Sequence, residues 1–452
     1  MTTLAAADHY ADAFEAVRRT APAPAAVTDL RRRAFERFAA LGIPTTRLEP
    51  WRFTNVSRIA NTPFALAQPA ERAAATAHAA PHALTGVDAL RLVFINGTCV
   101  LPASDLTGLP AGVTVGSLAD GLAPGAAGPG EVVESHLASG AGIDGEAFTA
   151  LNTALIRDGA IVHVPANTVV ERPIQLLFVT SPPAGGEPVM THPRVLIVVG
   201  ENAQVRIVES YGGGGESPYL TNTVAEVIAG PSAVVDHYKL VRESPAACHI
   251  ATMHVRLGRA ANFSSHAVTL GGAIVRNDSF AVLDGEGVNC TLNGLYLAKD
   301  RQLVDNHTTI HHAQPHCSSH ELYKGILDDR AHAVFNGKII VAIDAQKTDA
   351  KQTNKALLLS EDAQINTKPE LEIFADDVKC THGATVGQLD EDALFYLRAR
   401  GLGLEQARSV LIHAFASDLL NHIAIKPIRD QLDDLLLAQL PGSGGVSFHV
   451  DA

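Results

Sequence analysis

The sequence predicts a mainly β protein whose core is a β-helix, with α-helices before and after it. Three observations indicate this fold class. Helical periodicity nearly disappears after about residue 155. Short β-rich runs then alternate with turns, as in IVHVPANTVVERPIQLLFVT and RVLIVVGENAQVRIVES. Within this region a small residue follows a turn at intervals of about thirty residues, which is typical of stacked coils.

Residues 1–150 are predicted to form an N-terminal domain of helical and mixed structure. Residues 1–50 have helical character, and in LRRRAFERFAALG (30–42) the apolar residues share one helical face and a glycine ends the pattern. LRLVFING (90–97) is a strand candidate, and PGAAGPGE (124–131) has the composition of a linker or surface loop. We therefore expect a small helical cap ahead of the β core.

Residues 151–388 are predicted to form the β-helix core. Its recurring unit is a polar or glycine turn followed by a small residue that opens a strand: Ala203, Ala233, Ala261, Ala331 and Ala363. The first two intervals are 30 and 28 residues and the last is 32, but the longer gap between Ala261 and Ala331 does not fit one phase. Each coil of such a repeat buries its apolar face against its neighbours. A large β-sandwich with similar turn spacing is the alternative.

Residues 389–452 are predicted to form a C-terminal helical domain. Three helices are expected, at 389–403, 404–423 and 427–440. Asp390 is the candidate N-cap of the first, and Pro427 stands near the start of the third. The second and third helices are unusually apolar for a tail that lies on solvent. The tail therefore either packs on its own domain or presents a groove to another protein.

The composition limits the classes of function. The chain has 452 residues, of which 46% are hydrophobic, so it can bury a large core. Its formal net charge of −13 argues against a surface for nucleic acid or anionic membranes. The five cysteines are scattered and odd in number, as expected for reduced thiols rather than a disulfide framework. Since neither a signal peptide nor a membrane-spanning run is found, a cytoplasmic protein is expected.

The segment KPELEIFADDVKCTHGATVG (368–387) holds the most informative candidate site. Cys380 and His382 lie two residues apart among β-formers, and iron and other soft or borderline metals accept thiolate and imidazole as ligands. On a strand both side chains face one side, with Cα atoms about 6.6 Å apart at roughly 3.3 Å per residue. That spacing is wide for chelation of one small ion by the two side chains alone. It better suits a site in which other residues, or another subunit, supply the remaining ligands. A buried cysteine beside a hydrogen-bonded histidine is the alternative.

A second candidate is the histidine-rich segment DNHTTIHHAQPHCSSHELYKGILDDRAH (305–332). Its density of histidines suggests metal binding. However, Pro315 interrupts the segment, and no zinc-ligand spacing stands out on a helix. If the segment is a strand, His307 and His311 share a face, as histidines of a polar ladder would.

Acid–base and phosphate-binding chemistry have weaker signals. Asp376 and Asp377, with the nearby QKTDAKQTN (346–354), would suit a β-helix enzyme that acts on carbohydrate. Yet paired carboxylates are not obvious, and aromatic residues make up only 5% of the chain. GGGG (212–215) is not followed by a helix, and no GxxxxGK[ST] occurs. The chain is therefore not expected to bind ATP by itself.

From about residue 300 to 423 the sequence resembles the SufB/SufD family of iron–sulfur cluster assembly proteins. The stretches that carry the resemblance are DNHTTIHH, YKGIL (323–327), AVFNGKIIV (333–341), AQKTDAKQTNKALLLS (345–360), NTKPELEIFADDVKCTHGATVGQLD (366–390) and LFYLRARGL (394–402). EPWRFTN (49–55), after a short helical start, is similar to the SufD branch of that family.

This resemblance implies a right-handed parallel β-helix between an N-terminal helical domain and C-terminal helices. It implies a non-catalytic scaffold subunit that pairs with SufB through the β-helix and with the ATPase SufC through its C-terminal helices, and that forms a homodimer when isolated. Cys380 and His382 would be candidate metal ligands at the SufB interface, His382 being the favoured one. Iron or an iron–sulfur cluster would be held there transiently, with no cofactor stably bound by the chain alone. A carbohydrate-active β-helix enzyme and a purely structural partner of SufB are the alternatives.

Overall fold

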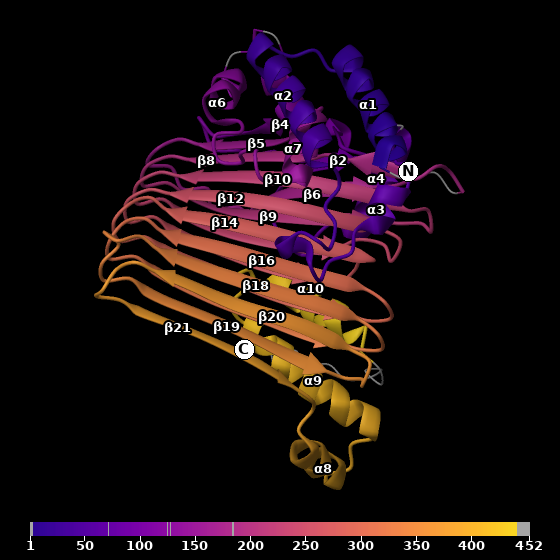
Figure 1. Cartoon of the computed structure of the whole chain (residues 1–452), viewed down its shortest axis with the longest axis vertical. Helices are drawn as coiled ribbons and strands as arrows, with labels where there is room; N and C mark the ends of the chain where they lie inside the picture. The colour runs from indigo at the N-terminus through magenta and orange to yellow at the C-terminus, as the bar shows by residue number, and fades with distance from the viewer. Residues whose placement is uncertain (1–2, 71, 124, 127, 183–184, 441–452) are drawn as a thin grey trace.

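The computed structural model describes residues 3–70, 72–123, 125–126, 128–182 and 185–440, and its core is a parallel β-solenoid (Figure 1). Each coil gives one strand to each of two sheets. Within each sheet the strands of successive coils pair in parallel and in register. A β-sandwich is built from antiparallel sheets, so the prediction of a β-helix is confirmed.

The two sheets run the whole length of the solenoid. Over the residues described, the first sheet has 11 strands: β20 (Gln364–Ile373), β18 (His332–Val341), β16 (Leu303–His312), β14 (Ile274–Leu283), β12 (Cys248–Leu257), β10 (Tyr219–Ala229), β8 (Arg194–Val199), β5 (Gly159–Val164), β4 (Thr114–Ser117), β1 (Ala65–Leu66) and β7 (Val189–Thr191). The second has 10: β21 (Lys379–Gly387), β19 (Asp349–Leu358), β17 (Ser318–Leu327), β15 (Asn289–Ala298), β13 (Asn262–Thr269), β11 (Val234–Arg242), β9 (Gln204–Gly213), β6 (Ile174–Thr180), β2 (Leu90–Ile95) and β3 (Thr98–Cys99).

The predicted repeat is correct in length but belongs to two interleaved series. Ala203, Ala233 and Ala261 precede β9, β11 and β13 of the second sheet, and all three are buried. Ala331 and Ala363 precede β18 and β20 of the first sheet. The interval from 261 to 331 therefore crosses from one sheet to the other, which is why it is not a whole number of repeats. Val288 and Cys317, which the pattern did not mark because they are larger, continue the second-sheet series.

The interior of the solenoid, here called the lumen, is packed with side chains from alternate positions of both sheets. Its apolar part is one continuous cluster that extends from Leu90 to Ala363. Two glycines make this packing possible near the middle. A Cβ at Gly294 would overlap the ring of Tyr323, and a Cβ at Gly325 would overlap the ring of Tyr296. The lumen is therefore a filled core and not an open pore.

The N-terminal region covers one end of the solenoid and the outer face of the first sheet (Figure 1). Three of its strands, β1, β2 and β4, pair with solenoid strands, so the sheets begin before residue 151. The predicted boundary at 151 remains a prediction. The strand expected at 90–97 is confirmed. Its helices are α1 (Thr3–Thr20), α2 (Ala25–Leu41), α3 (Ser57–Asn61), α4 (Arg72–Ala79), α5 (Leu118–Leu122), α6 (Pro129–His136) and α7 (Ala147–Ala154), with short 3-10 turns at Glu49–Trp51, Ala80–His82 and Leu101–Ala103.

The loop predicted at 124–131 is wrong at its C-terminal end. Pro129 occupies the first turn of α6, where proline is well tolerated because that N–H needs no helical partner. Residues 124 and 127 of the predicted loop lie outside the described residues. The helix expected at 30–42 is confirmed as the C-terminal part of α2, which ends before Gly42 with φ of 67°.

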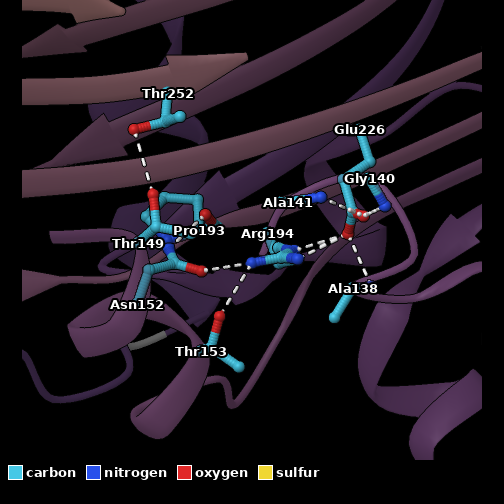
Figure 2. Close-up of polar contacts among 10 residues, drawn as sticks. All are labelled: Ala138, Gly140, Ala141, Thr149, Asn152, Thr153, Pro193, Arg194, Glu226 and Thr252. Carbon is cyan, nitrogen blue, oxygen red and sulfur yellow. Dashed lines mark hydrogen bonds and ion pairs between the residues drawn. The ribbon is translucent and has the colours of Figure 1, made fainter. Parts of the chain in front are cut away.

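A buried ion pair holds the N-terminal region on the first sheet (Figure 2). Arg194 Nη2 on β8 lies 2.5 Å from Glu226 Oε1 on β10, and both side chains are inaccessible to solvent. Arg194 Nη1 also donates to Asn152 and Thr153 on α7, while Glu226 accepts from backbone N–H groups in the loop 138–141. Buried charges are tolerated only when paired and hydrogen-bonded. The pair therefore specifies where α7 and this loop dock.

The C-terminal helices are α8 (Glu391–Ala399), α9 (Leu404–Leu420) and α10 (Lys426–Leu437), as predicted within a few residues. The side chain of Asp390 caps α8 by accepting from the N–H groups of Asp392 and Ala393. The apolar faces of α9 and α10 pack on the outer face of the second sheet, where Ile412 and Leu419 belong to the same apolar cluster as Leu295 and Ile326. Among the described residues, no helix is both long and apolar enough to cross a membrane.

Candidate functional site at the open end of the solenoid

The end of the solenoid formed by β20 and β21, here called the open end, presents two unpaired strand edges. In the described topology β20 pairs only with β18 and β21 only with β19. Unpaired edges offer N–H and C=O groups to another strand. Exposed apolar side chains surround them: Ile343, Ile373, Phe374 and Val386. This combination is typical of a surface that another chain covers.

Cys380 and His382 both lie on β21 at this open end. They are in register with Ala350 and Gln352 of β19, whose side chains face the lumen. Cys380 is half-buried against the last apolar cluster of the lumen, and desolvation raises the pKa of its thiol. The thiol is therefore protonated at neutral pH and must lose a proton to bind a metal.

His382 is exposed, because the coil that would cover it in the lumen is absent. The prediction that both side chains share one face is confirmed by the register. The alternative of a buried, hydrogen-bonded pair is wrong for His382. An imidazole at the mouth of the lumen, beside a half-buried thiol, is placed to meet groups from a second chain.

The histidine-rich segment does not form a metal site of its own. His307 and His311 share the outer face of β16, as predicted, and His307 Nε2 lies 3.0 Å from Asp305 Oδ1. His312 faces the lumen with its Nε2 2.9 Å from Ser319 Oγ, and His332 Nε2 lies 2.7 Å from Asn366 Oδ1. Within the described ranges, no group of three or more His, Cys, Asp or Glu side chains is arranged to hold a metal ion.

The acidic and basic residues of 346–377 form surface ion pairs. Lys347 pairs with Asp377, and Lys351 Nζ lies 3.3 Å from Asp349 Oδ1. All four side chains are well exposed. These carboxylates are held by lysines at the surface, whereas glycoside chemistry uses two carboxyl groups that flank one bond of the substrate.

Sequence reasoning missed a buried polar network inside the lumen. His237 lies with Nδ1 2.9 Å from Ser265 Oγ and Nε2 3.2 Å from Glu209 Oε1, and Lys239 donates to Asn277 nearby. The Ser–His–Glu order is that of a hydrolase triad. However, all three side chains are buried, and the adjacent cavity of about 30 Å³ has room for a single water molecule. The network is therefore closed to substrates. Glu209, His237 and Ser265 lie on β9, β11 and β13, too far apart in sequence for a motif.

Comparison with known proteins identifies the family. The SufBD core domain of the SUF system for FeS cluster assembly matches residues 181–415, and the SufBD protein N-terminal region matches residues 4–176. The chain belongs to the SufBD family. This SufBD protein is 38% identical, over 411 residues, to an iron–sulfur cluster assembly SufBD family protein of Synechocystis, which covers 89% of this chain and 88% of the relative.

Two further relatives support the same assignment. The iron–sulfur cluster assembly protein SufD of Escherichia coli is 32% identical over 406 residues, covering 89% of the chain and 90% of the relative. The chloroplastic protein ABCI7 of Arabidopsis thaliana is 36% identical over 293 residues, covering 64% of the chain and 62% of the relative. The resemblance inferred from the motifs is confirmed. The matched SufBD core includes the open end and α8.

Proposed function

We propose that this SufBD protein is a non-catalytic scaffold subunit of the SufD type in a cytoplasmic iron–sulfur cluster assembly complex, and that its open end is half of the assembly site. The observation that carries the proposal is the position of Cys380 and His382 on an unpaired edge strand within the matched core. A relative that covers nearly the full chain is named as the assembly protein SufD.

The open end is proposed to pair with the solenoid of SufB. Edges of β20 and β21 would hydrogen-bond to a partner's end strands, with the exposed Ile373, Phe374 and Val386 buried between the chains. A second copy of this chain presents the same edges. We therefore also propose that the isolated chain forms a homodimer through this end.

Cys380 and His382 are proposed to supply part of the ligand set for iron or for a nascent cluster, which is cargo here. Clusters are normally held by four ligands. One thiol and one imidazole at a subunit boundary would leave the remaining ligands to SufB. Of the two, His382 is the more accessible, and a neutral imidazole binds metal without first giving up a proton. No cofactor is proposed to stay bound to the chain alone.

The contact with an ABC-type ATPase, SufC, is proposed to lie on α8. Because α9 and α10 use their apolar faces on their own solenoid, the exposed apolar surface of the tail is concentrated at Phe395, which is 74% exposed, and Tyr396, which is 55% exposed. The sequence has no phosphate-binding loop of its own. Nucleotide-driven motion of the partner would thus reach the open end through α8 and the solenoid.

The test is purification of the chain together with its partner subunits, followed by cluster assembly with His382→Ala. We expect the complex to form normally and assembly to fall at least tenfold. Cys380→Ser is the companion variant, and His316→Ala, an exposed histidine outside the open end, is the control. Normal assembly by His382→Ala would favour the alternative of a purely structural partner of SufB. Failure to co-purify with an ATPase subunit would contradict the proposal as a whole.

A further inference from the structure

An inward-facing row at the open end joins a buried acid to the candidate site. Glu321 on β17 is in register with Gln352 on β19, and Gln352 is in register with His382 on β21. In-register neighbours on adjacent strands lie roughly 4.8 Å apart. Glu321 and Gln352 are buried, whereas His382 ends the row at the surface.

The side-chain amide of Gln352 is bonded at one end and unpartnered at the other. Its Nε2 donates to Glu321 Oε2 over 2.7 Å, while its buried Oε1 has no hydrogen-bond partner in the protein. Gly337 on the facing sheet makes room for this amide, because a Cβ there would overlap Nε2. In a planar carboxamide, oxygen and nitrogen point to opposite sides of Cδ. Since Nε2 bonds Glu321 on the preceding coil, Oε1 is directed away from Glu321, and the in-register neighbour on the following coil is His382.

We propose that Gln352 positions the His382 imidazole through a hydrogen bond, and that the Glu321 carboxyl group decides which end of the Gln352 amide the imidazole meets. When Glu321 is ionised, it accepts from Nε2, and Oε1 is left to accept an N–H from His382. When Glu321 has taken one proton from solvent, its O–H donates to Oε1. The amide then turns over, and Nε2 donates to the unprotonated ring nitrogen. No other bond forms or breaks.

Glu321 is suited to such a role by its surroundings. It is the one carboxyl group among the inward-facing side chains from β15 to β21, and desolvation raises its pKa to about 7. Its charge acts on two titratable neighbours, Cys290 and Tyr323, and burial raises the pKa of each far above neutrality. These neighbours therefore stay uncharged, and Glu321 is the buried group whose ionisation sets the direction of the Gln352 amide.

The consequence rests on the proposed function of His382. Metal-binding histidines generally donate their second ring N–H to an acceptor that fixes the tautomer and the ring orientation. Oε1 of Gln352 would be that acceptor, which leaves the other ring nitrogen free for iron. If Nε2 of Gln352 faced the imidazole instead, it would donate to the unprotonated ring nitrogen of His382 and block iron from that nitrogen. Ionised Glu321 therefore corresponds to the binding-competent arrangement and protonated Glu321 to a resting one.

The test uses the full chain with ¹⁵N-labelled histidine, in which His382 is assigned by the loss of its signals in His382→Ala. In the wild type we expect the ring nitrogen shifts of His382 to report one tautomer and to follow the ionisation of Glu321. Gln352→Leu should abolish the tautomer preference. Glu321→Gln should remove the change in the His382 shifts that follows the ionisation of Glu321. Gln352→Glu, which keeps an acceptor, should retain the preference. Lys351→Gln, on the outer face of the same strand, is the control. Unchanged His382 shifts in folded Gln352→Leu would overturn the inference.

Assembly by the complete complex separates this inference from the proposed function. We expect Gln352→Leu to assemble clusters at least tenfold more slowly, the lower end of the effect of removing such an orienting partner. If His382→Ala abolishes assembly while Gln352→Leu and Glu321→Gln assemble normally, the function stands and the positioning role is wrong. If His382→Ala assembles normally, the metal role of the site fails, and the nitrogen shifts alone decide the positioning role.

Discussion

The guanidinium carbon of Arg276 lies 3.8 Å from the centre of the Trp51 ring. Arg276, on β14, also donates to both carboxylate oxygens of Asp278 at 2.8 Å and to Asp305 at 2.7 Å. Thr54 donates to the same Asp305 oxygen. EPWRFTN (49–55) is thus fixed to the outer face of the first sheet by stacking and charge-assisted hydrogen bonds.

Trp51→Ala should detach this segment. Removing a buried aromatic side chain costs about 3–5 kcal/mol of unfolding free energy, and here the buried Arg276 would also lose its stacking partner. Phe53→Ala is the matched control, because Phe53 is 41% exposed whereas Trp51 is 5% exposed, and its removal should cost only about 1 kcal/mol. Urea unfolding followed by circular dichroism measures both values. Similar losses for the two variants would contradict the role assigned to Trp51.

Much of the fold was predictable from local patterns, since strand alternation, turn residues and helix caps act over a few neighbours. The Asp390 cap and the strand at 90–97 are examples. The assignment of a repeat to one sheet or the other was not predictable, because Ala261 and Ala331 are locally alike and differ only in the coil position that tertiary pairing gives them.

The candidate site was predictable only in part. The two-residue spacing placed Cys380 and His382 on one face, and family motifs singled them out. Glu321 and Gln352 could not be linked to His382, because 30 residues separate Gln352 from His382 and 31 separate Glu321 from Gln352, and only the parallel register brings the three together. The packing of the apolar tail was also left undecided between two alternatives. Its periodicity shows that α9 and α10 have apolar faces, but not that their own solenoid covers them.

Val386→Lys is expected to weaken self-association of the isolated chain. Val386 is exposed on the edge strand β21, and a charge there would have to be desolvated when a second chain pairs with that edge. Sedimentation equilibrium should show at least a tenfold weaker dimer. Val169→Lys is the control, since Val169 is a similarly exposed valine next to β9, several coils away from the open end. Equal dimer affinity for both variants would argue against the open end as the interface.

Phe395→Asp is expected to abolish binding of the ATPase subunit while leaving the stability of the chain unchanged. The side chain is exposed and lies on a capped helix, so its replacement removes no internal packing. Co-purification with the ATPase, together with a thermal melt, measures the two effects. Leu101→Asp changes an equally exposed apolar residue in the N-terminal region and should leave binding intact. Retained binding by Phe395→Asp would move the proposed contact away from α8.

The free energy of unfolding should fall as the pH drops below about 6.5, whereas above about pH 7 these groups should leave it nearly level. Burial lowers the pKa of five histidines, to about 3 for one of them and to about 4 for the others: His192, His249, His254, His266 and His312. Unfolded histidines titrate near about 6.5. Because the folded pKa values are the lower ones, this contribution is present above that pH and is lost as the pH falls.

Each of these histidines removes up to about 1.4 kcal/mol per pH unit between roughly 6.5 and 4. The opposite sign holds for Glu146 and Glu321, whose pKa values desolvation raises to about 7. Their contribution is lost between about pH 4.3, where unfolded glutamates titrate, and pH 7, so it offsets part of the histidine slope. Urea unfolding from pH 4.5 to 8.5 measures the profile. Below about pH 6.5, His312→Asn should reduce the slope of unfolding free energy against pH by up to about 1.4 kcal/mol per pH unit, the contribution of one proton. His316→Asn, at an exposed site, should leave that slope unchanged. An acid limb that is the same in both variants would show that buried histidines do not set the acid stability.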